Sequence, residues 1–193
     1  MRSHQYALGG YYTGINGWEF SVEGYYKDMR NVLEYKDGVS FFGSSSGWEN
    51  KVEMGKGRSA GIEFMAQKTA GKTTGWLSYT LSKSDRKFTK GGINNGEWFP
   101  YKYDRRHSIN LTINHKFSDR IDIGASWVFY TGGTSTIPEE KTTVIRPHNG
   151  ANNGFLWYGT YDNTNSSPTI GDVSYIEHRN NFRLPASHRL NLG

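Results

Sequence analysis

The sequence feature that most limits the fold is the strict alternation of apolar and polar residues between positions 108 and 130. Ile109, Leu111 and Ile113 alternate with Ser, Asn and Thr residues. After a short turn at 118–119 the same alternation runs through 121–130, with Ile, Ala, Trp and Phe as its apolar members. A period of two places successive side chains on opposite faces of a β-strand. The segment is therefore predicted to form two antiparallel strands, each with one apolar and one polar face.

The same alternation recurs elsewhere in the chain and predicts an all-β protein. It is found near 5–13, 18–26, 60–68 and 74–84 and starts again near 186, which gives about seven strands in total. The chain has 24 Gly, only 5 Pro and 15% aromatic residues, a composition that favours strands and turns over helices. No run approaches the roughly 18 apolar residues of a transmembrane helix.

The connections between the predicted strands alternate between short and long. Short turns fall at 14–17, 70–72 and 118–119, and long connections at about 27–57, 85–103 and 132–185. In a meander this pattern puts all short turns at one end and all long loops at the other, which is typical of outer-membrane barrels. Compact soluble domains seldom contain structureless loops longer than about 15 residues. We therefore expect an antiparallel up-and-down meander that is part of a transmembrane β-barrel, about seven strands of a larger barrel.

Polar and aromatic residues fit a sheet with lipid on one side and water on the other. Carboxylates and amides on the polar faces would be costly in a dry core and cost little in a wet lumen. Aromatic side chains gather near both predicted strand ends, where barrels carry girdles at the water interfaces. The girdle residues are expected at the short-turn end (Trp18, Trp76 and Phe117) and at the long-loop end (Tyr25, Tyr26, Tyr101, Tyr103, Phe129 and Tyr130).

Candidate ligand contacts are expected in the long loops and at the rim of the barrel. Arg105 and Arg106 suit an anionic ligand, because guanidinium groups bind carboxylate and phosphate in a forked geometry. The alternative is that both arginines anchor the strand in the headgroup or lipopolysaccharide zone, with His107 in the lumen. Aromatic loop residues are candidates for stacking on a sugar or a planar chelate, with the girdle as the alternative role: Trp98, Tyr101, Tyr103, Trp157 and Tyr158.

Catalysis, cofactors and nucleic acid find little support in the sequence. There is no H-E-x-x-H motif and no cysteine. The pattern G-x-S-x-G occurs at 43–47, which is expected to be a flexible loop tip, and at 57–61, where the chain is expected to re-enter the sheet, so neither match predicts a nucleophile elbow. Neither a catalytic group nor a metal or cofactor site is therefore predicted. The net charge of +5 comes from basic and acidic residues mixed along the chain, whereas a nucleic-acid groove concentrates its basic residues on one face. We therefore expect a protein that is not an enzyme and does not bind nucleic acid.

Several motifs together resemble a known family. They are the G-K-G-R-S-A-G-I-E-F strand at 55–64, G-W-L-S-Y-T-L-S at 75–82, Y-D-R-R-H at 103–107, W-V-F-Y-T-G-G at 127–133 and R-N-N-F-R-L-P-A-S-H-R-L-N-L-G at 179–193. The chain is similar over nearly its whole length to the C-terminal strands of TonB-dependent outer-membrane receptors. The likeness is strongest to the Bacteroidetes type, which begins with a carboxypeptidase-regulatory-like domain.

The resemblance implies that residues 1–193 form a partial receptor β-barrel domain, a fragment of a barrel of about 22 strands without the plug and the TonB box. Such receptors import a scarce large nutrient (a siderophore, cobalamin or a glycan) across the bacterial outer membrane. The partners implied are outer-membrane lipid and lipopolysaccharide, the nutrient, TonB-ExbB-ExbD through the plug region, and a surface lipoprotein. The alternative function is a soluble all-β carbohydrate-binding module, against which the scarcity of charge on the apolar faces counts.

Overall fold

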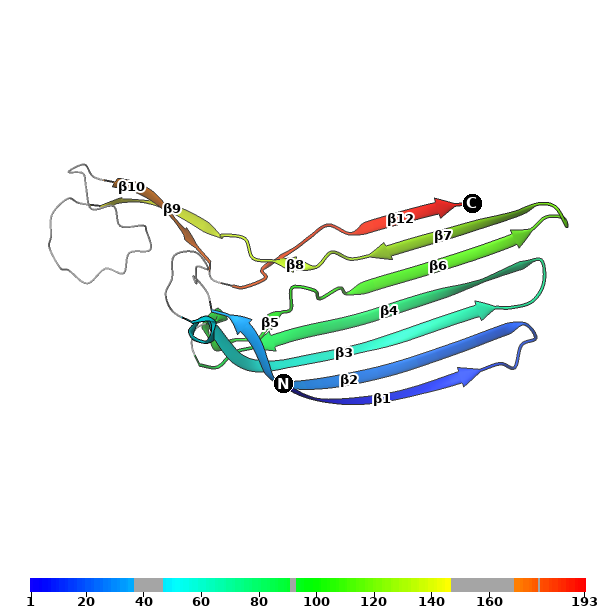
Figure 1. The fold of residues 1–193 in the computed structure, drawn as a ribbon, viewed down its shortest axis with the longest axis horizontal. Coiled ribbons are helices and arrows are strands. Elements are labelled where there is room, and N and C mark those ends of the chain that lie inside the picture. The colour runs from blue at the N-terminus through cyan, green and yellow to red at the C-terminus, as the bar shows by residue number, and fades with distance from the viewer. Residues whose placement is uncertain (37–46, 91–92, 147–168, 177) are drawn as a thin grey trace.

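The computed structural model describes residues 1–36, 47–90, 93–146, 169–176 and 178–193. In this part of the chain the fold is all-β, with one large antiparallel sheet and two small two-stranded ones (Figure 1). The large sheet consists of β1 (Arg2–Tyr12), β2 (Trp18–Tyr35), β3 (Val52–Lys68), β4 (Thr73–Lys87), β5 (Phe99–Pro100), β6 (His107–Lys116), β7 (Asp122–Tyr130) and β12 (Ser187–Leu192). The predicted antiparallel meander is thereby confirmed.

The strands follow one another in the order β1-β2-β3-β4-β6-β7-β12, and every neighbouring pair is antiparallel. The short turns that join β1 to β2, β3 to β4 and β6 to β7 all lie at one end of the sheet, as predicted (Figure 1). Two of these turns contain a glycine with positive φ, Gly17 at 74° and Gly71 at 93°, where a residue with a Cβ would be strained. We call the opposite end of the sheet the long-loop end.

Smaller elements occupy the long-loop end. β5 pairs with Asp85 and Arg86 near the end of β4. The 3-10 helix η1 (Trp48–Lys51) lies between β2 and β3, and η2 (Asn94–Gly96) lies between β4 and β5. β8 (Thr134–Ser135) pairs with β11 (Phe182–Arg183), and β9 (Glu140–Arg146) pairs with β10 (Thr169–Tyr175). The β9–β10 hairpin extends away from the large sheet in Figure 1. The described residues of the connection predicted at 132–185 therefore contain four short strands.

β2 and β3 are longer than the sequence indicated. Their pairing continues up to Tyr35 and Val52, so the long connection expected at about 27–57 is shorter than predicted. The alternation of apolar and polar residues ends at Lys27, so the sequence predicts that the second strand ends near Tyr26. A bulge between Arg30 and Val32, with Asn31 at φ 57°, interrupts the register but allows the pairing to resume beyond it.

The register divides the large sheet into two chemically different faces, because directly paired residues point to the same side. One row on the first side runs Tyr12, Phe20, Ala66, Leu77, Leu111, Trp127, Leu190 across seven strands. The adjacent row on the other side runs Glu19, Gln67, Trp76, Thr112, Ser126, Asn191. We call these sides the apolar face and the polar face; the predicted assignment of side chains to opposite faces is confirmed for these strands.

The apolar face carries a band that is free of charge and bounded by charge. At the short-turn end the band ends near Lys68, and at the long-loop end it ends near Lys83 and a row formed by Asp28, Arg58 and Asp85. Between these limits the paired residues of the described sheet include no Asp, Glu, Lys or Arg on this face. In β2 the band runs over eight residue steps from Trp18 to Tyr26, which at a rise of about 3.4 Å and a tilt of about 40° corresponds to a height of about 21 Å.

Nothing in the described part of the chain covers the apolar face. The strands make their extensive contacts with their neighbours in the sheet, and neither 3-10 helix packs across the band. Leu8, Val22 and Ile62 are 85%, 50% and 54% exposed. The buried hydrophobic residues Val32, Phe88, Ile93 and Phe99 form a small core at the long-loop end instead.

Three aromatic residues and one histidine differ from the sequence-based expectation. Trp76, Tyr25 and Tyr130 are paired with residues of the polar face, so they do not belong to a girdle on the apolar face. His107 pairs with Leu81 on the apolar face rather than in the predicted lumen. Its Nδ1 lies 2.9 Å from the hydroxyl of Tyr79, which supplies a polar partner within this apolar surface.

Candidate functional site: the clasp at the long-loop end

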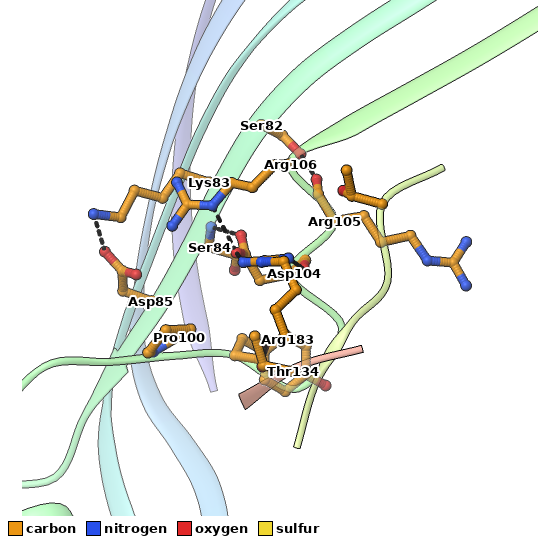
Figure 2. A network of polar contacts seen from close by, with 12 residues as sticks. Ser82, Lys83, Ser84, Asp85, Pro100, Asp104, Arg105, Arg106, Thr134 and Arg183 are labelled. Carbon is orange, nitrogen blue, oxygen red and sulfur yellow. Dashed lines mark hydrogen bonds and ion pairs between the residues drawn. The ribbon is translucent and has the colours of Figure 1, made fainter. Parts of the chain in front are cut away.

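A buried carboxylate organises the long-loop end of the sheet. Asp104 is only 1% exposed, and its Oδ1 accepts a hydrogen bond of 2.6 Å from the backbone N–H of Ser84 in β4. Its Oδ2 lies 3.0 Å from Nε of Arg106 and 2.6 Å from Nη2 of Arg183 (Figure 2). A carboxylate buried this deeply needs such compensation, because charge transferred from water without partners is very unfavourable.

Arg183 extends this network to the backbone of two other segments. Its Nη1 donates to the carbonyl of Asp104 at 2.6 Å and to the carbonyl of Gly132 at 2.9 Å. Leu184 donates its N–H to the carbonyl of Gly133 at 2.9 Å. One guanidinium group thus joins three segments that are far apart in sequence, around residues 104, 132 and 183.

Two asparagines next to Arg183 strengthen the same connection. The side-chain amide of Asn180 donates to the carbonyl of Pro100 at 2.7 Å, and its backbone N–H donates to Oγ1 of Thr136 at 3.0 Å. Asn181 bonds both the N–H and the carbonyl of Ile137, each at 3.0 Å. These side-chain hydrogen bonds extend the connection beyond the two paired residues of β8 and β11, where Oγ1 of Thr134 donates to the carbonyl of Tyr101 at 2.9 Å. We call this assembly the clasp: Asp104, Arg106, Thr134, Thr136, Asn180, Asn181 and Arg183.

The two predicted rim arginines have different surroundings. Arg106 belongs to the clasp, whereas Arg105 is directed away from Asp104 (Figure 2). The guanidinium carbon of Arg105 lies 4.2 Å from the centre of the Tyr130 ring, a cation–π geometry. The structure therefore does not bring Arg105 and Arg106 together into one fork.

The predicted aromatic platform is partly occupied by cations. Arg58 lies over the ring of Trp98 at 4.3 Å, and Arg86 lies over the ring of Tyr101 at 3.7 Å. Tyr101 and Tyr103 also contact each other edge to face, with ring centres 5.3 Å apart. Each of these cations covers one ring face and leaves less aromatic surface for a stacked ligand. Trp157 and Tyr158 lie outside the described residues.

A second charged group lies beside the small core. Nη1 of Arg86 is 3.4 Å from Oε2 of Glu34, and Nη2 of Arg179 is 3.8 Å from the other oxygen of the same carboxylate. The Nε of Arg86 is buried and has no hydrogen-bond partner in the described structure. Glu34 thus joins the extended hairpin of β2 and β3 to the segment that carries the clasp.

A hollow that sequence reasoning missed lies at the same end of the sheet. It has a volume of about 640 Å³, and its lining includes Trp48, Glu53, Met54 and Lys90. Trp48 is 63% exposed, which is unusual for so large an apolar ring. Trp48 lies directly before β3, which begins earlier than its apolar alternation indicates. The sequence therefore predicts a loop around Trp48 and gives no sign of the hollow.

The contacts described at the long-loop end are hydrogen bonds, ion pairs and cation–π pairs. In the part of the chain that the structure describes, no group of three His, Asp or Glu residues is placed to hold a metal ion. No helix among the described residues is long and apolar enough to cross a membrane. No family model, no curated protein and no solved structure matches the chain.

Proposed function

We propose that this chain forms part of the wall and the outer loops of a transmembrane β-barrel in the bacterial outer membrane, in a receptor of the TonB-dependent kind. The observation that carries the proposal is the uncovered apolar band between Lys68 at one end and Lys83, Arg58 and Asp85 at the other. Its height of about 21 Å is close to the roughly 25 Å apolar belt of membrane barrels.

The polar face supports the same proposal. Glu23 and Glu63 are direct cross-strand partners and both are exposed. Like charges placed opposite each other repel, and a dry core would increase that repulsion by lowering the dielectric constant. A water-filled lumen screens the pair, so this face fits the inside of a wide barrel better than the core of a sandwich.

The two edges of the sheet set a condition on the complete barrel. β1 and β12 are related by six antiparallel steps and therefore run in the same direction. Their outer N–H and C=O groups need strand partners if the sheet lies in hydrocarbon. An odd number of additional strands between them would close an antiparallel barrel with an even strand count, as bacterial barrels have.

The receptor function draws its support from the motifs together with the loop geometry. The Y-D-R-R-H segment supplies Asp104 and Arg106 of the clasp, and the R-N-N-F-R segment supplies Asn180, Asn181 and Arg183. A fastened set of outer loops beside a hollow with an exposed tryptophan suits the capture of a large solute, because long loops on a rigid scaffold are where binding residues concentrate. We infer that a siderophore, cobalamin or glycan is bound there and imported with energy from TonB-ExbB-ExbD.

A cysteine scan along β6 tests the membrane part of the proposal. The chain contains no cysteine, so single substitutions from Ser108 to Asn114 report without background. In native membranes, a membrane-impermeant maleimide is expected to label cysteines at 108, 110, 112 and 114 through the lumen. Cysteines at 109, 111 and 113 are expected to be protected and to be quenched by lipid-borne spin labels when they carry a fluorophore. Equal labelling at odd and even positions would rule out the proposed orientation.

A comparison of two deletion strains tests the receptor part. Cells that lack this protein are expected to lose uptake of one large nutrient, and cells that lack TonB should lose uptake of that same nutrient. Uptake that depends on this protein but continues without TonB would contradict the receptor class while leaving the barrel intact.

A further inference from the structure

The apolar face contains a hollow of about 700 Å³ near its long-loop end. Its volume falls within the range of about 300–1,000 Å³ that is common for small-molecule sites. Gly24 and Ala60 form its floor, and larger apolar side chains stand around them. The surrounding residues are Tyr6, Leu8, Tyr26, Ile62 and Leu81.

The hollow follows directly from the strand register. Gly24 lies between Leu8 of β1 and Ile62 of β3, so one position in a row of large side chains has none. A Cβ built on Gly24 would meet no atom within 4 Å. In the next row Ala60 lies between Tyr26 and Lys83, which continues the depression toward the charged end of the band.

Two cations line the same hollow at its long-loop side, namely Lys83 and Arg106. Lys83 shares the carboxylate of Asp85 with Arg58, at 3.5 Å and 3.0 Å respectively. Arg106 shares the carboxylate of Asp104 with Arg183. Four cations thus surround two carboxylates, and Asp28, beside Arg58 in the same row, is paired with Arg30 at 3.2 Å, so the local charge is 5 − 3 = +2.

Both cations retain the capacity to bind an anion. The side chains of Lys83 and Arg106 are 53% and 33% exposed. Arg106 contacts Asp104 through Nε, and its two terminal nitrogens have no hydrogen-bond partner among the described residues. Guanidinium and ammonium groups in this position suit phosphate oxygens, with arginine offering paired donors.

We propose that this hollow binds a phosphorylated glycolipid of the lipid A kind. One acyl chain lies over Gly24 and Ala60, and the phosphorylated headgroup lies against Lys83 and Arg106. The choice of a lipid with two phosphates follows from the local surplus of two positive charges and from the position of the site at the edge of the apolar band. The inference rests on the proposed function, in which this face contacts membrane lipid and the long-loop end faces outward.

The acyl-chain part is tested by filling the hollow. With protein purified from its membrane in detergent, native mass spectrometry measures retention of diphosphoryl lipid A. Gly24→Leu is expected to weaken binding by about tenfold or more, because its side chain occupies the place of the acyl chain. The matched control is Gly10→Leu. Gly10 lies on the apolar face of β1, outside the hollow, and a Cβ built on it would meet no atom within 4 Å. Binding of lipid A by this variant should stay within about twofold of the wild type.

The phosphate part is tested with one cation at each end of the band. Lys83→Gln is expected to weaken binding of diphosphoryl lipid A by about fivefold to tenfold. Lys68→Gln removes the same charge from the short-turn end of the apolar face and should leave binding unchanged. Lipid A from which both phosphates have been removed should bind the wild type and Lys83→Gln equally weakly.

The failure of this inference can be distinguished from the failure of the proposed function. If the cysteine scan alternates but Gly24→Leu binds lipid A like the wild type, the lipid site is wrong and the membrane orientation stands. Stronger retention of phosphatidylglycerol than of lipid A would also overturn the site as proposed. If the cysteine scan does not alternate, the membrane orientation itself is wrong.

Discussion

The middle of the large sheet and its long-loop end differ in what happens to their apolar side chains. In the middle, apolar side chains such as Leu8 and Ile62 remain exposed, and the chain provides no cover for them. At the long-loop end, Phe88 and Ile93 are fully buried and Asp104 is enclosed by partners from three segments. The long-loop end supplies its own small core, whereas the middle of the sheet leaves its apolar face uncovered by the described residues. In the proposed barrel that face would contact hydrocarbon, while the long-loop end would contact water.

The largest expected effect comes from removing the centre of the clasp. Asp104→Ala leaves two guanidinium groups and the N–H of Ser84 without their buried acceptor, and breaking such a network costs about 3–5 kcal/mol. Hydrogen exchange should show loss of protection at Ser84 and Leu184 but continued protection at Leu77 in the middle of β4. Asp119→Ala, at a fully exposed turn residue, serves as the control and should change nothing measurable. Loss of protection throughout the sheet would show that the two regions are one cooperative unit.

A charge placed within the apolar band is the second test of the comparison. Leu111→Arg is expected to lower the free energy of unfolding from lipid vesicles by about 2–4 kcal/mol, the cost of an arginine near the middle of the bilayer. Its neighbour Thr112→Arg, on the polar face, should leave this free energy nearly unchanged. Ile123→Arg should cost less than Leu111→Arg, because Ile123 pairs with His115 at the short-turn edge of the band. Equal costs at positions 111 and 112 would contradict the division into two faces.

A smaller effect is expected where two backbones approach closely in the clasp. A Cβ on Gly132 would overlap the carbonyl oxygen of Leu184, so Gly132→Ala must push apart the segments that Arg183 joins. We expect a loss of about 1–3 kcal/mol in the free energy of unfolding, in the range typical of overpacking. Gly124→Ala is the control, since the nearest atom to its Cβ would be 3.8 Å away. Limited proteolysis of the long-loop end provides an independent measurement, and an unchanged cleavage rate in Gly132→Ala would argue against the observed approach.

The smallest effect concerns the one hydrogen-bonded pair described above on the apolar face. Tyr79→Phe removes the hydroxyl that lies 2.9 Å from Nδ1 of His107 and should cost about 1 kcal/mol, the net value of a typical hydrogen bond. Tyr6→Phe removes a hydroxyl of the same face that has no hydrogen bond to a described residue, and should cost less. Chemical denaturation in lipid vesicles measures both. A cost for Tyr6→Phe equal to that for Tyr79→Phe would show that the pair adds nothing.

The meander and its two faces were predictable because they depend on local alternation and on turn residues. Ile109, Leu111 and Ile113 specify one side of β6 by themselves, and the short turns specify antiparallel neighbours. The ends of β2 and β3 were not predictable in this way. Their outer parts are charged, and β3 is joined there to β4 by Arg58 and Asp85, which are 27 residues apart. Trp76, Tyr25 and Tyr130 were misassigned because closeness to a strand end does not decide which face a ring occupies.

The clasp was not predictable for a related reason. Asp104 and Arg183 lie 79 residues apart, and no local period relates them. Asn180 and Asn181 have the composition of an ordinary loop, and only the tertiary structure shows that their amides bind the carbonyls of Pro100 and Ile137. Arg105 and Arg106 are adjacent in sequence, which suggests that they bind one anion together. Adjacent side chains of an extended chain point in opposite directions, however, and the two guanidinium groups have different partners.

The bulge at Asn31 has a consequence for how the two regions coexist on one strand pair. Below it, even-numbered residues of β2 such as Phe20, Val22 and Tyr26 point to the apolar face. One inserted residue reverses this phase, so that Val32 turns to the opposite side and reaches the core formed with Phe88 and Phe99. Asn31 thus acts as a phase switch: it lets one continuous strand present Val22 and Tyr26 on the uncovered face and Val32 on the side of the core.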